Sequence, residues 1–523
     1  MPKQIQVNIP PESAYNEELT KNFIAAYLKI NKNDISGIRI LKRSIDARKQ
    51  ETKINVSAII YFGKQKPMPL ITNEFKYQNV ENQLPVIIIG AGPAGIFAAL
   101  RLIELGLKPI IIEQGKDVHQ RKKDIAQINR NEALNPLSNY CFGQGGAGAF
   151  SDGKLHTRST KKGNISRILE IFHLNGANEN VLYDAHPHIG SDKLPDIIEN
   201  LMNTILKYGG EVHYNTKLTD ILIKNNKIAG CQTADGKEFK AKALILATGH
   251  SARDIYELLQ KKNLALQAAG FAMGVRVEHS QTLIDTIQYH SLIKTNFLPP
   301  ASYTLTTQID ERGVYSFCMC PGGHIVPAVS AENQIVVNGM SVAKRNSPFA
   351  NSGIVVEIRP EDVPEQFQKY GAFAGLRFQQ YLENLAFTNN GGKGQTAPAQ
   401  RVTDFVTGKL SASLPKSSYL PGLISSPLHF WLPKSISIRL QKGFMIFDRR
   451  MRGFLTNDAV VVGVESRTSS PVRILRDKET MQHIEVQGLF PCGEGAGYAG
   501  GITSSAMDGE NAAAKVAEFL GKV

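Results

Sequence analysis

The stretch Pro85-Val-Ile-Ile-Ile-Gly-Ala-Gly-Pro-Ala-Gly95 decides the fold of this chain. Its β-branched start, residues 86–89, is typical of a strand that is buried on both faces. Three glycines follow with G-x-G-x-x-G spacing. Gly90 permits a tight turn, Gly92 lets a pyrophosphate approach the backbone, and Gly95 lets helix and strand pack closely. Such a motif alone is weak evidence, so the sequence around it decides what it means.

The sequence after the glycines completes a dinucleotide-binding unit. Residues 96–105 are predicted to form a helix whose N-terminal N–H groups and partial positive charge suit phosphates. Residues 108–112 are a second buried strand, which ends at Glu113, 23 residues after the first glycine. An acid at this position can accept hydrogen bonds from both ribose hydroxyls of an adenosine. We therefore predict a dinucleotide site rather than a chance glycine loop, and its contacts also include Pro93, Ala94 and Gln114.

Length and composition indicate a globular protein of two or three domains. The 523 residues are 42% hydrophobic and 20% charged. No segment approaches the ~20 uninterrupted apolar residues that cross a bilayer, and the first residues lack the apolar core of a secretion signal. Five cysteines in a chain of this length favour reduced thiols and a cytoplasmic location over a disulfide framework. No metal site is predicted.

The formal net charge of +13 favours anionic ligands. Dinucleotide phosphates account for part of such a bias, and a generally basic, solvated surface is the preferred interpretation of the rest. We expect a small-molecule substrate, for which an anionic one fits this charge, and no nucleic-acid partner. The sequence leaves the oligomeric state open.

Changes in composition and in predicted secondary structure along the chain indicate five segments. Residues 1–70 form a small α+β domain in the order β-α-β-β, and residues 71–84 are a linker. Residues 85–255 and 484–523 are the two parts of the dinucleotide domain, and 256–483 are an inserted α+β substrate domain. In the first segment, one helix face is predicted to hold Leu19, Phe23, Ala26 and Tyr27, and the basic side chains of Lys42, Arg43 and Arg48 are predicted to be solvated.

A second glycine-rich segment, residues 139–155, follows the dinucleotide motif. Its glycines are too dense for the interior of a strand or helix, and such a loop lets backbone approach a flat ligand or a phosphate. Because the loop also carries Phe142 and Phe150, wrapping of a cofactor is favoured over a plain flexible loop. The predicted contacts here are Gly145, Gly146 and Ala147, with Arg121 from the preceding polar helix.

Three separated motifs together resemble the glutathione-reductase-type FAD-binding fold. They are the 90–95 turn with Glu113, then Ala243-Leu-Ile-Leu-Ala-Thr-Gly249, then Leu489-Phe-Pro-Cys-Gly-Glu494. Longer strings, among them Gly145-Gly-Ala-Gly-Ala-Phe-Ser-Asp-Gly-Lys154, resemble the uncharacterised bacterial FAD-dependent dehydrogenases, also called NAD(FAD)-utilising dehydrogenases. The resemblance covers nearly the whole chain. It implies an α/β fold with a split, Rossmann-like FAD/NAD(P)-binding domain (ββα three-layer) and FAD as cofactor, but it supplies no substrate.

The resemblance also implies a role for each matching residue. Glu113 corresponds to the acid that binds the adenosine ribose, and Leu218 falls where the fold contacts adenine through its backbone. Glu494 stands where the broader fold has an aspartate that holds the ribityl chain. Residues 502–505 open the last helix, whose positive end would face the flavin and stabilise the reduced ring. The remaining implied FAD contacts are Ala247, Thr248, Gly249, Gly493, Gly500, Gly501 and Ile502.

Residues 256–483, where a second nucleotide-binding domain would lie, contain no G-x-G-x-x-G spacing, and the sequence contains no C-x-x-C pair. A nicotinamide donor, NAD(P)H, would therefore visit the flavin without a Rossmann domain of its own, and it stays an open alternative as a transient electron donor. The pair Cys318-x-Cys320 lies in a predicted strand, where buried inert thiols are favoured over a redox dithiol. Cys492 is expected to have a packing role.

His250 and Arg467 are the candidate catalytic residues. His250 follows the second FAD motif directly, and histidine is a common acid-base group near neutral pH. Arg467, in a polar segment, can hold a carboxylate substrate by bidentate hydrogen bonds. Pairing with Glu465 or capping of a loop is an equally favoured structural role for this arginine. His279 and His324 are expected to be satisfied structural histidines.

Two helices are predicted in the inserted domain, over residues 364–384 and 433–454. In the second, five apolar residues share one face, for which a core-facing position is favoured over docking on an anionic membrane. These residues are Ile436, Leu440, Phe444, Phe447 and Met451.

The sequence thus predicts an FAD-dependent oxidoreductase, a dehydrogenase that transfers hydride between an unidentified organic substrate and FAD. One alternative is a membrane-surface flavin reductase of an unsaturated, lipid-like substrate. The other is a flavin-bearing module that binds RNA or protein through its basic surface.

Overall fold

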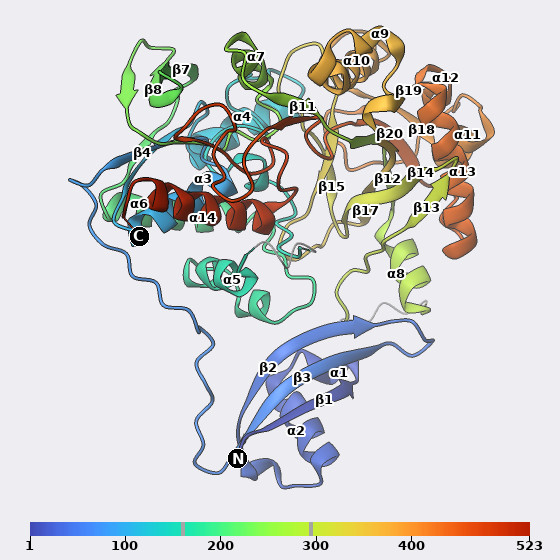
Figure 1. The fold of residues 1–523 in the computed structure, drawn as a ribbon. Helices are drawn as coiled ribbons and strands as arrows, with labels where there is room; N and C mark the ends of the chain where they lie inside the picture. Colours follow the sequence, from blue (N-terminus) through green and yellow to red (C-terminus); the bar gives the residue numbers. More distant parts are fainter. Residues whose placement is uncertain (158–162, 292–296, 523) are drawn as a thin grey trace.

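The computed structural model of the chain describes residues 1–157, 163–291 and 297–522. Figure 1 shows a small N-terminal domain, a domain built on a parallel sheet, and a domain built on a larger mixed sheet. The last helix, α14 (Ile502–Phe519), returns to the parallel-sheet domain. This domain is therefore assembled from two distant parts of the chain, and the predicted α/β fold class is confirmed.

The N-terminal domain packs helices on a three-stranded antiparallel sheet in the order β1-β3-β2. On the central strand, Ile54, Val56, Ala58 and Ile60 alternate with more exposed residues and are fully buried against the helices. The elements are β1 (Lys3–Ile9), α1 (Pro11–Ala14), α2 (Glu17–Leu28), η1 (Lys32–Asp34), β2 (Ile35–Asp46) and β3 (Lys53–Phe62).

The apolar face predicted for the N-terminal helix is wrong. Leu19 and Tyr27 are exposed, whereas α2 buries Thr20, Ile24 and Ala25. Thr20 tolerates burial because its hydroxyl donates a hydrogen bond of 2.8 Å to a carbonyl oxygen of α1. A count of apolar residues cannot detect such a satisfied polar contact.

Arg43 connects the N-terminal domain to the rest of the molecule and is not solvated, in contrast to the prediction. Its side chain is 10% exposed and forms a bidentate ion pair with Asp184, at 2.8 and 3.1 Å. The guanidinium also lies 4.4 Å from the centre of the Tyr15 ring. Arg48, in contrast, is exposed and pairs with Asp46 within the same strand region.

The dinucleotide domain contains a five-stranded parallel sheet in the order β22-β10-β4-β5-β6. Alternate side chains of β4 enter different cores: Val86 and Ile88 contact the helical layer, while Ile87 and Ile89 contact the opposite layer. The edge strand β22 comes from the C-terminal segment and completes the split domain. The strands are β4 (Pro85–Ile89), β5 (Lys108–Ile112), β6 (Glu211–His213), β10 (Leu244–Leu246) and β22 (Leu489–Pro491).

Helices cover one face of this sheet, and a three-stranded β-meander covers the other (Figure 1). The helical layer contains α3 (Pro93–Glu104), α4 (Val118–Asn129), α5 (Ile165–Leu174), α6 (Leu194–Lys207) and α14. The meander contains β7 (Leu218–Lys224), β8 (Lys227–Thr233) and β9 (Glu238–Lys240). Helix α7 (Arg253–Lys261) shares the core of the meander, so the predicted boundary after residue 255 falls inside this helix.

The inserted domain is built on a seven-stranded sheet in the order β13-β14-β17-β12-β20-β18-β19. Strand β12 lies at its centre, and nine of its ten residues are buried. The strands are β12 (Phe271–Ser280), β13 (Thr306–Ile309), β14 (Arg312–Cys320), β17 (Phe349–Ile358), β18 (Ala397–Arg401), β19 (Leu423–Ser425) and β20 (Val460–Glu465). Two small pairs, β11 (Leu266–Ala268) with β21 (Val472–Ile474) and β15 (His324–Pro327) with β16 (Val337–Met340), flank it.

Both helices predicted in the inserted domain differ from the structure in their bounds, and the second, predicted over residues 433–454, already ends at Arg450. The predicted helix 364–384 is divided into α9 (Glu365–Gln368), η6 (Gly371–Phe373) and α10 (Ala374–Thr388). Gly371 has φ +56, a left-handed conformation that ends a helix. The other helices are α8 (Gln281–Tyr289), α11 (Val402–Thr407), α12 (Leu428–Trp431) and α13 (Lys434–Arg450).

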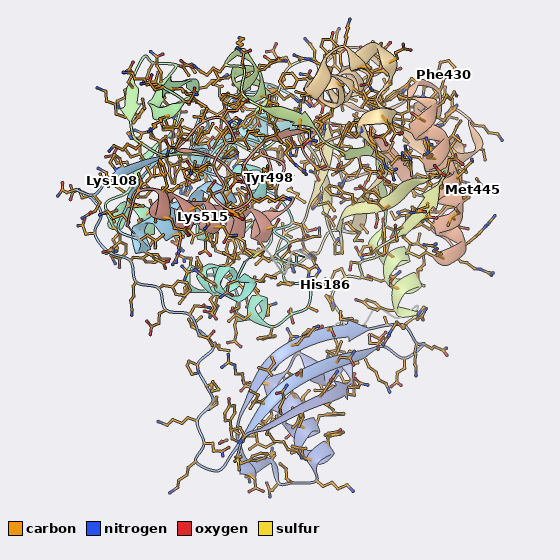
Figure 2. All side chains as sticks on the ribbon, viewed as in Figure 1. Lys108, His186, Phe430, Met445, Tyr498 and Lys515 are labelled. Atoms are coloured by element: carbon orange, nitrogen blue, oxygen red, sulfur yellow. The ribbon has the colours of Figure 1, made fainter. Side chains whose placement is uncertain are left out.

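The apolar face of α13 is buried in the core of the inserted domain, as the favoured prediction stated. Phe430 and Met445, which Figure 2 shows at the edge of the molecule, remain exposed as separate side chains. Within residues 1–157, 163–291 and 297–522, no helix combines the length and apolarity that a membrane span requires.

Candidate active site

A cavity lies where the two parts of the dinucleotide domain meet the inserted domain, with about 1390 Å³ of empty space when its open mouth is included. Its walls come from the turn before α3, the ends of β5 and β10, and the C-terminal segment around residues 493–505. Phe317, Cys318 and Asn338 line it from the inserted domain. Segments that are distant in the sequence therefore share one cavity.

Backbone packing requires glycine at two positions of the turn. Gly90 has φ +104, and a Cβ atom there would lie 2.5 Å from the carbonyl oxygen of Ala247. A Cβ atom at Gly95 would lie 2.0 Å from the carbonyl oxygen of Gly90. At Gly92 the nearest atom would be 3.8 Å away, and this residue lines the cavity. Gly90 and Gly95 thus hold strand, turn and helix together, while Gly92 keeps the cavity wall open.

Glu113 organises the glycine turns around it. Its carboxylate is 6% exposed and accepts N–H bonds from Ala91 at 2.8 Å, Gly115 at 2.9 Å and Gly143 at 3.0 Å. These bonds tie the first turn to the glycine-rich loop. A carboxylate has about four acceptor positions, so this side chain, which lines the cavity, retains one for a ligand hydroxyl.

Arg121 and Gly145 do not line the cavity, although both were predicted as cofactor contacts. Arg121 is fully buried, and its guanidinium donates to the carbonyl oxygens of Asn139, Tyr140 and Gln144 at 2.8 to 3.0 Å. Burial lowers its pKa to about 10. The side chain therefore fixes the glycine-rich loop from behind, while Gly145 packs against α6.

Two helices begin at the cavity without a side-chain cap. Helix α3 follows Gly92 and α14 follows Gly501, and these glycines have no side chain that could cap the helix. Both helix starts line the cavity. Each helix N-terminus carries a partial positive charge, so one cavity offers two anion-binding ends. FAD, with phosphates in its middle and a ring that becomes negative on reduction, fits this set of donors.

Models of three protein families match successive parts of the chain. Residues 1–61 match a domain of unknown function, DUF8436; residues 84–269 match the pyridine nucleotide-disulphide oxidoreductases; and residues 270–468 match the C-terminal domain-like region of FAD-dependent proteins. An uncharacterized protein from Clostridium beijerinckii is 40% identical over 515 residues, which cover 95% of this chain and 94% of that protein. The chain belongs to the family of FAD-dependent proteins.

This FAD-dependent protein is an oxidoreductase, and the predicted cofactor, FAD, is confirmed. A more distant relative, a thiamine thiazole synthase from Aeropyrum pernix, is 26% identical over 214 residues, 38% of this chain and 66% of that protein. The crystal structure of CtdE in complex with FAD and a substrate covers 83% of this chain and 81% of its own, with 11% identity and a TM-score of 0.33. Likeness at this level carries no information about the reaction.

Most residues predicted to contact FAD line the cavity, and three lie behind its wall. Gly95, Arg121 and Gly145 are the three that support the wall. Contact of the others with FAD stays a prediction. The residues that line the cavity are Gly90, Gly92, Pro93, Ala94, Glu113, Gln114, Gly146, Ala147, Leu218, Ala247, Thr248, Gly249, Gly493, Glu494, Gly500, Gly501 and Ile502.

His250 and Glu494 face each other in the cavity wall. The His250 Nδ1 and Glu494 Oε1 atoms lie 3.1 Å apart, without the angle of a hydrogen bond. Histidine next to a carboxylate is a pair that can hold and release a proton. Glu494 stands where the broader fold has an aspartate, and its longer side chain brings the carboxylate next to His250.

Arg467 lines the cavity, but its guanidinium already forms hydrogen bonds with other side chains of the protein. Its nitrogens lie 3.2 and 3.3 Å from the carboxylate of Glu383 and 2.7 Å from the Ser330 hydroxyl. Glu465 is not its partner, because Glu465 pairs with Arg276 at 2.9 Å. A structural role, with Glu383 as the partner, is therefore what these contacts support, and the predicted grip on a substrate carboxylate stays untested.

Sequence reasoning missed Glu383 and misjudged the burial of Cys318. Glu383 is fully buried between two arginines, and no local motif marks it. Cys320 is buried, as predicted. Cys318 is half-buried and lines the cavity, so the predicted burial is wrong for this residue. The one available signal is the C-x-C spacing, which places two sulfurs on neighbouring positions of a strand that borders the site.

Proposed function

We propose that this oxidoreductase transfers a hydride between an organic substrate and FAD in the cavity between the dinucleotide domain and the inserted domain. When bound, FAD supplies the ring that accepts or donates the hydride. The observation that supports this proposal is one cavity that two helix N-termini enter and that residues of the inserted domain line from the other side.

The residues of the chain would bind, orient and exclude water. The N-terminus of α14 would stabilise negative charge on the reduced ring. Phe317 offers an apolar surface on the inserted-domain side, where a substrate would enter. The pair of His250 and Glu494 is the candidate for moving a proton during the reaction.

The proposed partner is a small organic molecule, with NAD(P)H as an alternative electron donor. Among residues 1–157, 163–291 and 297–522, the five-stranded sheet is the one all-parallel sheet, so a nicotinamide nucleotide would reach the flavin from the inserted-domain side. The membrane-surface alternative is less well supported, because the apolar face of α13 that suggested it is buried in the core of the inserted domain.

An absorbance spectrum and anaerobic photoreduction of the purified protein test this proposal. We expect a yellow protein whose bound flavin bleaches on illumination and is reoxidised by one class in a panel of carbonyl, enone, quinone and nicotinamide compounds. A protein that binds no flavin after reconstitution with FAD would overturn the proposal.

Substitution of Gly92 by valine provides a matched pair with substitution of Gly313 by valine. The backbone tolerates a side chain at Gly92, which would extend toward the cavity and displace the pyrophosphate. Gly313 lies in β14, where a Cβ atom meets only the flexible end of Glu357 and a neighbouring tyrosine ring. We expect Gly92→Val to lose most of its flavin and Gly313→Val to retain it, with similar urea unfolding curves.

A further inference from the structure

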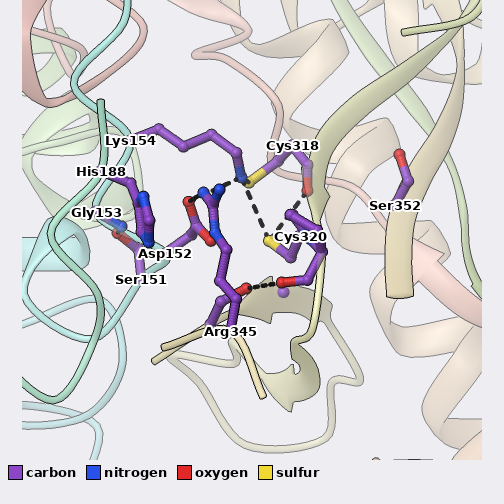
Figure 3. Close-up of polar contacts among 12 residues, drawn as sticks. Ser151, Asp152, Gly153, Lys154, His188, Cys318, Cys320, Arg345 and Ser352 are labelled. Carbon is purple, nitrogen blue, oxygen red and sulfur yellow. Dashed lines mark hydrogen bonds and ion pairs between the residues drawn. The ribbon is translucent and has the colours of Figure 1, made fainter. Parts of the chain in front are cut away.

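Lys154 lies between two cysteines at the wall of the cavity. Its ammonium nitrogen is 3.8 Å from the Cys318 sulfur and 3.5 Å from the Cys320 sulfur. Figure 3 shows the lysine side chain extending toward both cysteines. The lysine ends the glycine-rich loop of the dinucleotide domain, whereas both cysteines belong to β14 of the inserted domain. The two domains therefore bring an amine and two thiols together at the site.

The two sulfurs differ in their access to the cavity. Cys318 is half-buried and lines the cavity, while Cys320 is fully buried behind it. A guanidinium nitrogen of Arg276 lies 3.7 Å from the Cys320 sulfur. Asp152 lies 3.4 Å from the Lys154 nitrogen and is itself paired with Arg345 at 2.8 Å. Glu465, in turn, pairs with Arg276 at 2.9 Å. Three cations (Lys154, Arg276 and Arg345) therefore face two carboxylates (Asp152 and Glu465), which leaves an excess of one positive charge around the sulfurs.

The environment favours one thiolate and one thiol. A hydrogen bond from Cys320 lowers the pKa of Cys318 well below its usual range, and attraction to Lys154 and Arg276 adds to this effect against the cost of burial. The same contact and burial raise the pKa of Cys320 well above its usual range. The Cys320 thiol also lies 3.3 Å from the Cys318 carbonyl oxygen, to which it can donate. A half-buried thiolate beside a buried thiol is the arrangement of an attacking sulfur and its partner.

The backbone of β14 is irregular at this point. Cys318 has φ +46, an uncommon conformation for a residue other than glycine, and the register with β17 shifts between Phe317 and Cys320. Arg276 donates a hydrogen bond of 2.7 Å to the Cys318 carbonyl oxygen and so holds this conformation. A bulge changes the direction in which the side chains of a strand point, and this bulge lies in the part of β14 that borders the cavity.

We propose that Cys318 and Cys320 form a redox-active dithiol that exchanges two electrons with the flavin, an inference that rests on the function proposed above. The Cys320 S–H bond breaks as the Cys318–Cys320 S–S bond forms. The two electrons and the Cys320 proton leave together as one hydride equivalent, which oxidised FAD accepts. In the opposite direction, the disulfide accepts a hydride equivalent and returns to one thiol and one thiolate. The dithiol stores a second electron pair beside the cofactor.

Anaerobic titration of the oxidised holoenzyme with dithionite measures this capacity. We expect four electrons per flavin for the natural protein and two for Cys318→Ala and Cys320→Ala. Cys231→Ala, which changes a buried cysteine in the meander, is the matched control and should keep four. A count of two electrons per flavin in the natural protein would overturn the inference while leaving the proposed function intact.

Mass spectrometry of the natural protein provides a second readout that needs no variant. The tryptic peptide 313–344 contains Cys318 and Cys320 and no other cysteine. In the oxidised holoenzyme, alkylation before digestion should leave this peptide unmodified and two hydrogens lighter, whereas the photoreduced enzyme should carry two alkyl groups. Full alkylation of both cysteines in the oxidised enzyme would refute the dithiol, and a protein that binds no flavin would refute both proposals.

Discussion

Replacement of Glu383 by glutamine tests the contact between the two larger domains. The buried carboxylate of Glu383, on α10, accepts hydrogen bonds from Arg253 at 2.8 and 2.8 Å and from Arg467 at 3.2 and 3.3 Å. Arg253 begins α7 beside the dinucleotide domain, whereas Arg467 follows β20 in the inserted domain. Glutamine keeps the shape of the side chain but removes the charge that compensates both guanidinium groups.

Two routes give the expected loss in the free energy of unfolding. Removal of one partner of a buried ion pair typically costs about 3 to 5 kcal/mol, because the remaining charge is left unpaired. Burial acts to raise the pKa of Glu383, but the two arginines hold it at about 2, below its ordinary 4.5. At ~1.4 kcal/mol per pH unit, this difference corresponds to about 3 kcal/mol. We therefore expect Glu383→Gln to lose about 3 to 5 kcal/mol.

Urea unfolding followed by the fluorescence of Trp431, the single tryptophan of the chain, measures this loss in the inserted domain. Glu257→Gln is the matched control, because Glu257 pairs with Arg377 at 2.9 Å across the same two helices, α7 and α10. Those side chains are 42% and 31% exposed, and such pairs contribute about 0 to 1 kcal/mol. Equal losses for the two variants would refute the reasoning.

The same carboxylate predicts a pH dependence. Because its pKa is lower in the folded state than in the unfolded state, its contribution to stability is complete above about pH 4.5 and is lost as the pH falls toward about 2. Between about pH 5 and about pH 3, the natural protein should therefore lose more stability than Glu383→Gln. Parallel losses in the two proteins would show that another group controls the acid transition.

Three further substitutions test other contacts. In the photoreduced enzyme, Lys154→Met should slow the alkylation of Cys318 at neutral pH by roughly tenfold or more, because loss of the ammonium group raises the pKa of the thiol, and Lys154→Arg should restore the rate. An unchanged alkylation rate in Lys154→Met, measured by mass spectrometry, would contradict this. Arg121→Met should reduce the flavin retained after dialysis, because the glycine-rich loop loses the donor to three carbonyl oxygens; full retention would show that the loop holds its shape without it. Arg43→Ala should release the N-terminal domain by breaking its pair with Asp184, seen as faster tryptic cleavage between residues 63 and 84; an unchanged cleavage rate would show that other contacts dock the domain.

The parts of the fold that local sequence determines were predictable. The strand, turn and helix around Gly90 follow from residue size and backbone conformation alone, because a Cβ atom at Gly90 or Gly95 would meet backbone within 2.5 Å. The failure at α2 has a physical cause as well, since Thr20 is buried through a hydrogen bond that apolar periodicity does not register. Periodicity identified the helix but not the face that it buries.

The same distinction between local and distant contacts applies to the candidate site. Residues on one motif, such as Gly92 and Glu494, line the cavity because a short segment carries both the residue and its position. The contacts of Glu383 and Lys154 join segments that are far apart in the sequence, and no spacing rule connects an amine at residue 154 with sulfurs at 318 and 320. The difference matters for chemistry, because the charge of a distant lysine is what separates a reactive thiolate from an inert buried thiol. In this protein the spacing of two cysteines suggested packing, and only the approach of the second domain changes that interpretation.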